Sequence, residues 1–85
     1  MRLGVQFSGA VGANSSFTWF THSWPATWRV VWMVVPTGPT QDSAPQIEWK
    51  VRVERQTSTL LKYYLAVTNL SGRTVNVEAR YAVLD

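Results

Sequence analysis

The sequence predicts an all-β fold, a small antiparallel β-sandwich or partly open barrel of about six strands. Hydrophobic residues alternate with polar ones over most of the chain, and β-branched and aromatic types stand in phase. Stretches rich in Gly, Pro, Ser and Asn separate these segments, as turns do. No segment combines a 3.6-residue hydrophobic period with helix caps. With 85 residues, the chain is expected to form a single β domain over residues 1–85.

The first half of the chain contains three alternating segments. They are residues 2–10, 16–22 and 27–35. In the first, Leu3, Val5 and Phe7 are expected to share one face of a strand. The third is apolar on both faces from Val30 onward, which is typical of a central strand covered on both sides. The proline-rich connection 36–45 is predicted to be a loop.

The second half contains three more. They are residues 45–55, 59–70 and 74–84. A three-residue loop, Ser71-Gly72-Arg73, joins the last two segments and predicts an antiparallel hairpin with Tyr63 opposite Tyr81. The short connections favour an up-and-down strand order, in which Lys62 would face Lys50 or Arg52 across the preceding hairpin.

Residues 17–32 hold four of the chain's five tryptophans, and most of these rings are expected in the core. Trp28, Trp32 and Trp49 lie on apolar strand faces. Trp24 stands between Ser23 and a proline, so it is expected in a loop. There its ring is either a plug that closes the end of the sandwich or an exposed platform for a ligand.

The platform interpretation predicts a ligand site. Sugar sites combine a ring that stacks on the apolar face of a pyranose with short polar groups that bond its hydroxyls. His22, Ser23 and Trp24 supply that mixture, and an up-and-down order brings Arg55 and Gln56 to the same end. The sequence therefore predicts a small lectin-like, carbohydrate-binding protein with these five residues at its site.

No catalytic or cofactor motif is present, and the chain is interpreted as a non-enzyme that needs no cofactor. Glu48 and Glu54 share a face but stand about 20 Å apart along a strand, too far for paired-carboxylate hydrolysis. His22 is the sole histidine and there is no cysteine, which argues against a metal site. The sequence contains no phosphate-binding loop and no dinucleotide fingerprint.

The eight Lys and Arg residues against five Asp and Glu give a net charge of +3. These bases are dispersed, which argues against nucleic acid as a partner. No signal peptide or bilayer-long apolar run is visible, so we expect a soluble protein, cytoplasmic or released by a route without such a signal.

Apolar surface in excess of what 85 residues can bury predicts self-association as a dimer or higher homo-oligomer. Two alternatives without a sugar ligand stay open. One is a structural or assembly module, and the other is a membrane-active toxin anchored by Trp24 and Phe20. The segments YYLAVTNLS and VEARYAVL resemble those of bacterial β-sandwiches in general, and this resemblance implies no particular site residue.

Overall fold

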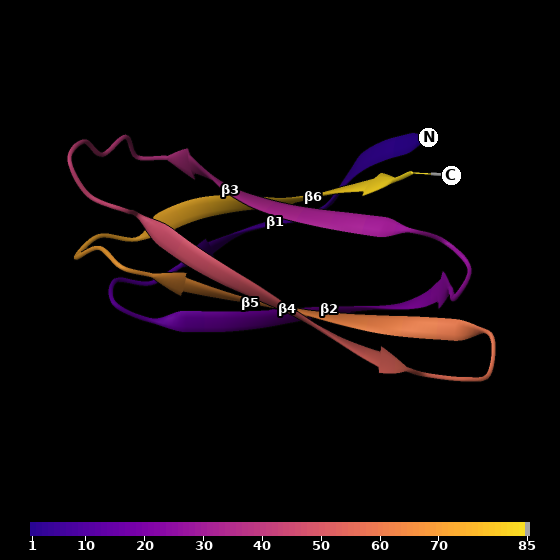
Figure 1. Ribbon diagram of the computed structural model, residues 1–85. Helices are drawn as coiled ribbons and strands as arrows, with labels where there is room; N and C mark the ends of the chain where they lie inside the picture. Colours follow the sequence, from indigo (N-terminus) through magenta and orange to yellow (C-terminus); the bar gives the residue numbers. More distant parts are fainter. Residues whose placement is uncertain (85) are drawn as a thin grey trace.

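Two three-stranded antiparallel sheets pack face to face in the computed structural model, which describes residues 1–84 (Figure 1). The all-β sandwich prediction is confirmed, and the sheets do not close into a barrel. One sheet has the order β1 (Arg2–Val11), β6 (Val75–Val83), β3 (Val30–Gly38). The other has the order β2 (Ser16–Pro25), β5 (Leu60–Asn69), β4 (Ile47–Arg55). Within residues 1–84 there is no helix long and apolar enough to cross a membrane.

The chain passes from one sheet to the other at every connection except the β4–β5 hairpin. The predicted up-and-down order and the predicted hairpin of the last two strands are therefore wrong. Tyr63 and Tyr81 lie in opposite sheets, each on an inward face, and both rings pack against Trp24 and Trp32 instead of pairing along a ladder. The alternation marks which side chains face the core. Two strands that face each other across the core show the same alternation as two strands that pair within one sheet, so the pattern does not distinguish the two arrangements.

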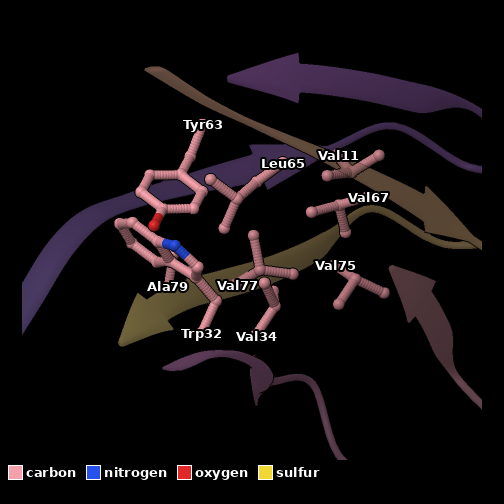
Figure 2. Packing of buried hydrophobic residues seen from close by; sticks show 9 residues of the cluster. All are labelled: Val11, Trp32, Val34, Tyr63, Leu65, Val67, Val75, Val77 and Ala79. Atoms are coloured by element: carbon pink, nitrogen blue, oxygen red, sulfur yellow. The ribbon is translucent and has the colours of Figure 1, made fainter. Parts of the chain in front are cut away.

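The core lies between the central strands of the two sheets (Figure 2). Leu65 and Val67 of β5 face Val77 and Ala79 of β6, and all four are fully or almost fully buried. Trp32 and Tyr63 close one side of this cluster, whereas Val11 and Val75 close the other. Burying these side chains supplies most of the driving force for folding, because hydrophobic stabilisation scales with the apolar area removed from water.

A β-bulge between Val5 and Phe7 changes the face that β1 turns to the core. Leu3 and Val5 therefore lie on the outer surface, and Phe7 packs against the core. The predicted common face of these three residues is wrong, because one extra residue in a strand reverses the alternation after it. Two glycines of β1, Gly4 and Gly9, leave room for the rings of Tyr81 and Trp19 respectively.

Two edge strands expose apolar side chains that the sequence predicts to be buried. β3 pairs only with β6, so it is an edge strand, and its outward Val31 and Met33 are 51% and 52% exposed. The predicted central position of this strand is wrong. β4 is also an edge strand, because it pairs only with β5, and it runs obliquely in the view of Figure 1. Its inward Trp49 is 37% exposed, so the prediction that this ring is core is also wrong.

Asn69 ties together the two turns at one end of the sandwich. Its side chain is 1% exposed, and Nδ2 donates to the carbonyl oxygens of Val11, Gly12 and Arg73 at 3.0, 3.1 and 2.6 Å. Its Oδ1 accepts from the backbone N–H and the hydroxyl of Ser71, both at 2.8 Å. The buried amide is therefore fully hydrogen-bonded, and these bonds offset the free-energy cost of removing it from water.

Candidate functional site

Trp24 is the centre of a cluster of five rings. Its ring centroid lies 5.2 Å from that of Tyr81, 5.3 Å from Trp32, 6.2 Å from Tyr63 and 6.3 Å from Trp28, all in edge-to-face geometry. Such pairs add about 0.5–1.5 kcal/mol each beyond the burial of their area. Trp24 therefore fills the end of the sandwich, and of the two open interpretations the structure supports the plug.

A bulge in β2 explains why this ring points inward. Thr21 pairs with Tyr63 and Trp24 with Leu61, so His22 and Ser23 are both accommodated opposite one residue of β5. Ser23 adopts the left-handed conformation, with φ of 66°. The extra residue puts Trp24 on the same inward face as Thr21, whose Oγ1 accepts the indole N–H at 2.6 Å. Trp24 lies within β2, so its predicted loop position is wrong.

The other predicted sugar-site residues form a small polar network at the same end. The Ser23 N–H donates to Oε1 of Gln56 at 3.0 Å, and Nδ1 of His22 is hydrogen-bonded to Oγ of Ser23 at 3.0 Å. Arg55 Nη1 donates to the carbonyl of Ser58 within its own turn. The structure thus brings His22, Ser23 and Gln56 together, through the pairing of β2 with β5. It turns the Trp24 ring away from them into the sandwich.

A hollow of about 420 Å³ lies on the outer face of the sheet β2–β5–β4. It forms because Ala66 occupies the middle of this face, between Thr18 of β2 and Lys50 of β4 in the same row. The neighbouring row consists of Phe20, Tyr64 and Arg52. The residues that line the hollow are Thr18, Arg52, Val53, Glu54, Tyr64 and Ala66.

The Tyr64 ring, which lines this hollow, lies close to the Phe20 ring and to the ammonium group of Lys62. The ring centroids of Phe20 and Tyr64 lie 6.4 Å apart, and Phe20 is 61% exposed. The Lys62 Nζ lies 5.6 Å from the Phe20 centroid and 5.9 Å from that of Tyr64, within cation–π range. Lys62 pairs with Glu54 in the β4–β5 hairpin, so its predicted position opposite Lys50 or Arg52 is wrong.

Tyr64 and Glu54 form the polar wall of the hollow. The phenol donates a 2.6 Å hydrogen bond to Oε1 of Glu54. This bond, together with partial desolvation and the charge of Glu54, raises the pKa of Tyr64 above its ordinary value of 10.0. Tyr64 is therefore neutral at physiological pH, and its hydroxyl holds the carboxylate in one place.

A second, smaller hollow of about 180 Å³ lies on the outer face of the other sheet. Leu3, Val31 and Met33 give it apolar walls, and Ala82 is its floor. Arg80, whose Nε donates to Oε2 of Glu78 at 2.6 Å, is the charged residue at its border. This surface offers apolar contact with few polar groups.

Among residues 1–84, no three His, Cys, Asp or Glu side chains gather in a way that could hold a metal ion. No family model, no curated protein and no solved structure matches the chain.

Proposed function

We propose that this protein is a non-catalytic, lectin-like binding module that holds a carbohydrate in the hollow over Ala66. One observation carries the proposal. A small side chain in the middle of a solvent-facing sheet leaves a recess lined by the Tyr64 ring, Arg52, Glu54 and Thr18, and the exposed Phe20 ring lies next to Tyr64. Concave sites with a few convergent polar groups are the usual form of small-ligand sites.

The groups around the recess suit a pyranose. The exposed Phe20 ring and the Tyr64 ring beside it supply apolar faces against which the C–H groups of a sugar can pack. Arg52 and Glu54 supply a two-pronged donor and a two-pronged acceptor, which match adjacent hydroxyl groups. Thr18 adds a hydroxyl that donates or accepts from the opposite wall.

This proposal keeps the carbohydrate ligand that the sequence predicted and moves its site. The earlier site depended on an exposed Trp24, whose ring is packed against four others. His22, Ser23, Arg55 and Gln56 bond within their own end of the sandwich and do not line the recess.

A glycan array of the native protein beside two matched variants tests the proposal. Ala66→Leu fills the recess without deleting any contact. Ala82→Leu makes the same change at a half-buried outer-face alanine in the central strand of the other sheet. We expect glycan binding by the native chain and by Ala82→Leu, and its loss in Ala66→Leu. If Ala66→Leu still binds the glycan, the proposed site is refuted. If the native chain binds no glycan, the proposed ligand class is refuted.

Self-association is a second candidate function, as part of a structural or assembly module. The observation that favours it is the uncovered apolar surface on both sheets. Leu3, Val5, Val31 and Met33 on one outer face are each more than half exposed, and Val53 of β4 is 59% exposed. Apolar patches of this kind mark contact surfaces on small proteins. Sedimentation over a range of concentrations tests it, with a monomer at every concentration as the contrary result.

A further inference from the structure

We infer that two copies of the chain pair antiparallel through their β4 strands and join their sheets β2–β5–β4 into one continuous six-stranded sheet. The inference rests on the self-association proposed above and names the surface and the register. It concerns the one edge of the sandwich that the fold leaves open to strand pairing.

Each sheet has two edge strands, and three of the four are irregular. β1 has a register shift between Val5 and Phe7, and β3 has one beside Pro36. β2 has its bulge before Trp24 and ends at Pro25. Bulges and prolines are the devices by which proteins keep edge strands from pairing with other chains. β4 has nine residues in unbroken register, with neither proline nor glycine.

The free edge of β4 exposes backbone groups that can be identified from the hairpin. The Leu70 N–H donates to the Gln46 carbonyl, and the Gln56 N–H donates to the Leu60 carbonyl. In an antiparallel strand, the backbone N–H and C=O groups of successive residues point alternately to one neighbouring strand and to the other. Gln46 and Gln56 both bond toward β5, so the even-numbered residues of β4 between them do so too. The N–H and C=O groups of the odd-numbered residues therefore point away from β5. The residues concerned are Ile47, Trp49, Val51 and Val53.

The same odd-numbered residues carry the apolar side chains that the opposite sheet fails to cover. Trp49 and Val51 are each 37% exposed and Val53 is 59% exposed. A second β4 alongside would satisfy the free backbone groups and cover the flank of this apolar row in one step. Burial of apolar side chains next to a completed ladder is what stabilises strand addition.

One register satisfies both faces of the joined sheet. Apolar side chains meet apolar ones only if the two paired residue numbers add to an even sum. A two-fold axis at Lys50 sets Trp49 opposite Val51, and Ile47 opposite Val53, of the second copy. On the outer face the same register sets Glu48 of each copy opposite Arg52 of the other, which makes two ion pairs. No ion pair within residues 1–84 already uses Glu48 or Arg52.

The neighbouring registers each lose one of these two features. An axis at Trp49 also makes two outer ion pairs, Glu48 with Lys50, but it sets Val53 opposite Pro45, beyond the end of β4, so the apolar row is covered over a shorter length. An axis at Val51 sets Glu48 opposite Glu54 and Lys50 opposite Arg52, so every outer pair has like charges. An axis at Arg52 makes two outer ion pairs, Lys50 with Glu54, but on the inner face it sets Trp49 opposite Arg55. The Lys50 axis has a single like pair, Lys50 with itself. Of these four registers, the Lys50 axis is the one that sets Trp49, Val51 and Val53 all opposite apolar residues of the second β4 and also pairs Glu48 with a base.

Cysteine cross-linking tests this register, because the native chain has no cysteine. At the Lys50 axis, Lys50→Cys places two thiols in a non-hydrogen-bonded pair, with Cα atoms about 4.5 Å apart. That spacing suits a disulfide. Arg52→Cys is the matched control, since its two thiols would stand four residues, or about 13 Å, apart. We expect a disulfide-linked dimer from Lys50→Cys and none from Arg52→Cys. The reverse result would overturn the register.

Sedimentation of the native chain and two sets of variants tests the edge itself. Val51→Pro removes an N–H that points to the free edge and leaves every β4–β5 hydrogen bond intact, so the dimer should be lost. Glu48→Arg should weaken the dimer about tenfold or more, and Glu48→Arg with Arg52→Glu should restore it. This charge exchange keeps the test valid if the proline variant fails to fold.

The outcomes separate this inference from self-association as such. A native dimer that survives both Val51→Pro and Glu48→Arg overturns pairing through β4 and leaves self-association standing. A native monomer at every concentration overturns both. Val31→Lys, on the apolar outer face of the other sheet, is the control that should keep the dimer.

Discussion

The indole N–H of Trp24 donates a 2.6 Å hydrogen bond to Oγ1 of Thr21, across the bulge that separates them in β2. This bond gives the indole N–H of a partly buried tryptophan an acceptor, and an indole N–H that leaves water without an acceptor costs free energy. The acceptor lies on the same strand, and the bulge makes the contact possible. Trp24 can therefore be an interior ring although it is next to a proline and near the end of a strand.

Replacing Trp24 should destabilise the fold as much as replacing the ring beside it. We expect Trp24→Ala and Trp32→Ala each to lower the free energy of unfolding by about 3–5 kcal/mol, the usual range for deleting a large buried ring. Phe20→Ala, at an exposed outer-face ring, should cost about 0.5 kcal/mol or less. Urea or thermal melts of the three variants measure this. A Trp24→Ala melt close to that of Phe20→Ala would show that the ring is not a plug.

Gly9 should tolerate no side chain. A Cβ at this position would lie 2.8 Å from the Trp19 ring, which is stacked on Phe7 with centroids 4.5 Å apart. We expect Gly9→Ala to cost about 1–3 kcal/mol, the range for overpacking a core. The control is Gly72→Ala, where nothing lies within 4 Å of the added carbon and φ is not positive. Equal melting temperatures for the two variants would mean that Trp19 does not pack on Gly9.

Asn69→Asp should be destabilising at neutral pH and less so in acid. The Asn69 Nδ2 donates to three backbone carbonyls, and a carboxylate oxygen in its place would face them with no proton to share. A loss on the order of 3 kcal/mol is expected, because a buried charge replaces a donor. Protonation of the new carboxyl restores one donor, so the deficit relative to the native chain should shrink as the pH falls. A deficit that is constant with pH would contradict this account.

Alkaline pH should weaken the fold through two tyrosines. Burial raises the pKa of Tyr63, and the bond to Glu54 is the main cause that raises the pKa of Tyr64. The folded chain holds both phenol protons more tightly than the unfolded chain. Their contribution to stability is therefore complete below about pH 10, and it is lost as the pH rises through the raised pKa values.

Glu54→Gln isolates the Tyr64 part of this effect. Removing the carboxylate should lower the pKa of Tyr64 toward its ordinary value, and an ultraviolet titration of phenolate absorbance measures the change. Glu48→Gln removes a charge from the same face, opposite Thr68 and away from Tyr64, and should leave the titration curve unchanged. Identical curves for the two variants would disprove the Tyr64–Glu54 interaction.

The six strands could be predicted because runs of β-branched and aromatic residues, most of them alternating with polar ones, are separated by turn residues. Their arrangement could not, for two physical reasons. The alternation of Tyr63 and Tyr81 shows that both face the core, and it does not say whether their strands pair or face each other. A bulge adds one residue to a strand, and amino-acid composition does not reveal it. The sequence pattern therefore places Leu3 and Val5 of β1 on the wrong face, and it places Trp24 of β2 in a loop.

The candidate site shows the same limit. Tyr64, Arg52 and Lys62 could be assigned to a polar strand face from sequence alone. Phe20 lies beside Tyr64 only because β2 pairs with β5 across a separation of more than forty residues, and the local pattern contains no trace of that pairing. The hollow itself comes from Ala66, and an alanine on a half-exposed face has no distinguishing signal until its neighbours in adjacent strands are known.

A nuclear magnetic resonance titration with a panel of methyl pyranosides tests the central claim most directly, because it reports both whether a sugar binds and where. We expect the largest saturable shifts at the amides of Thr18, Tyr64 and Ala66, around the hollow on the outer face of β2–β5–β4. Shifts centred on Ser23 and Gln56 would instead restore the site at the end of the sandwich. Spectra that no pyranoside changes would contradict the proposed carbohydrate function.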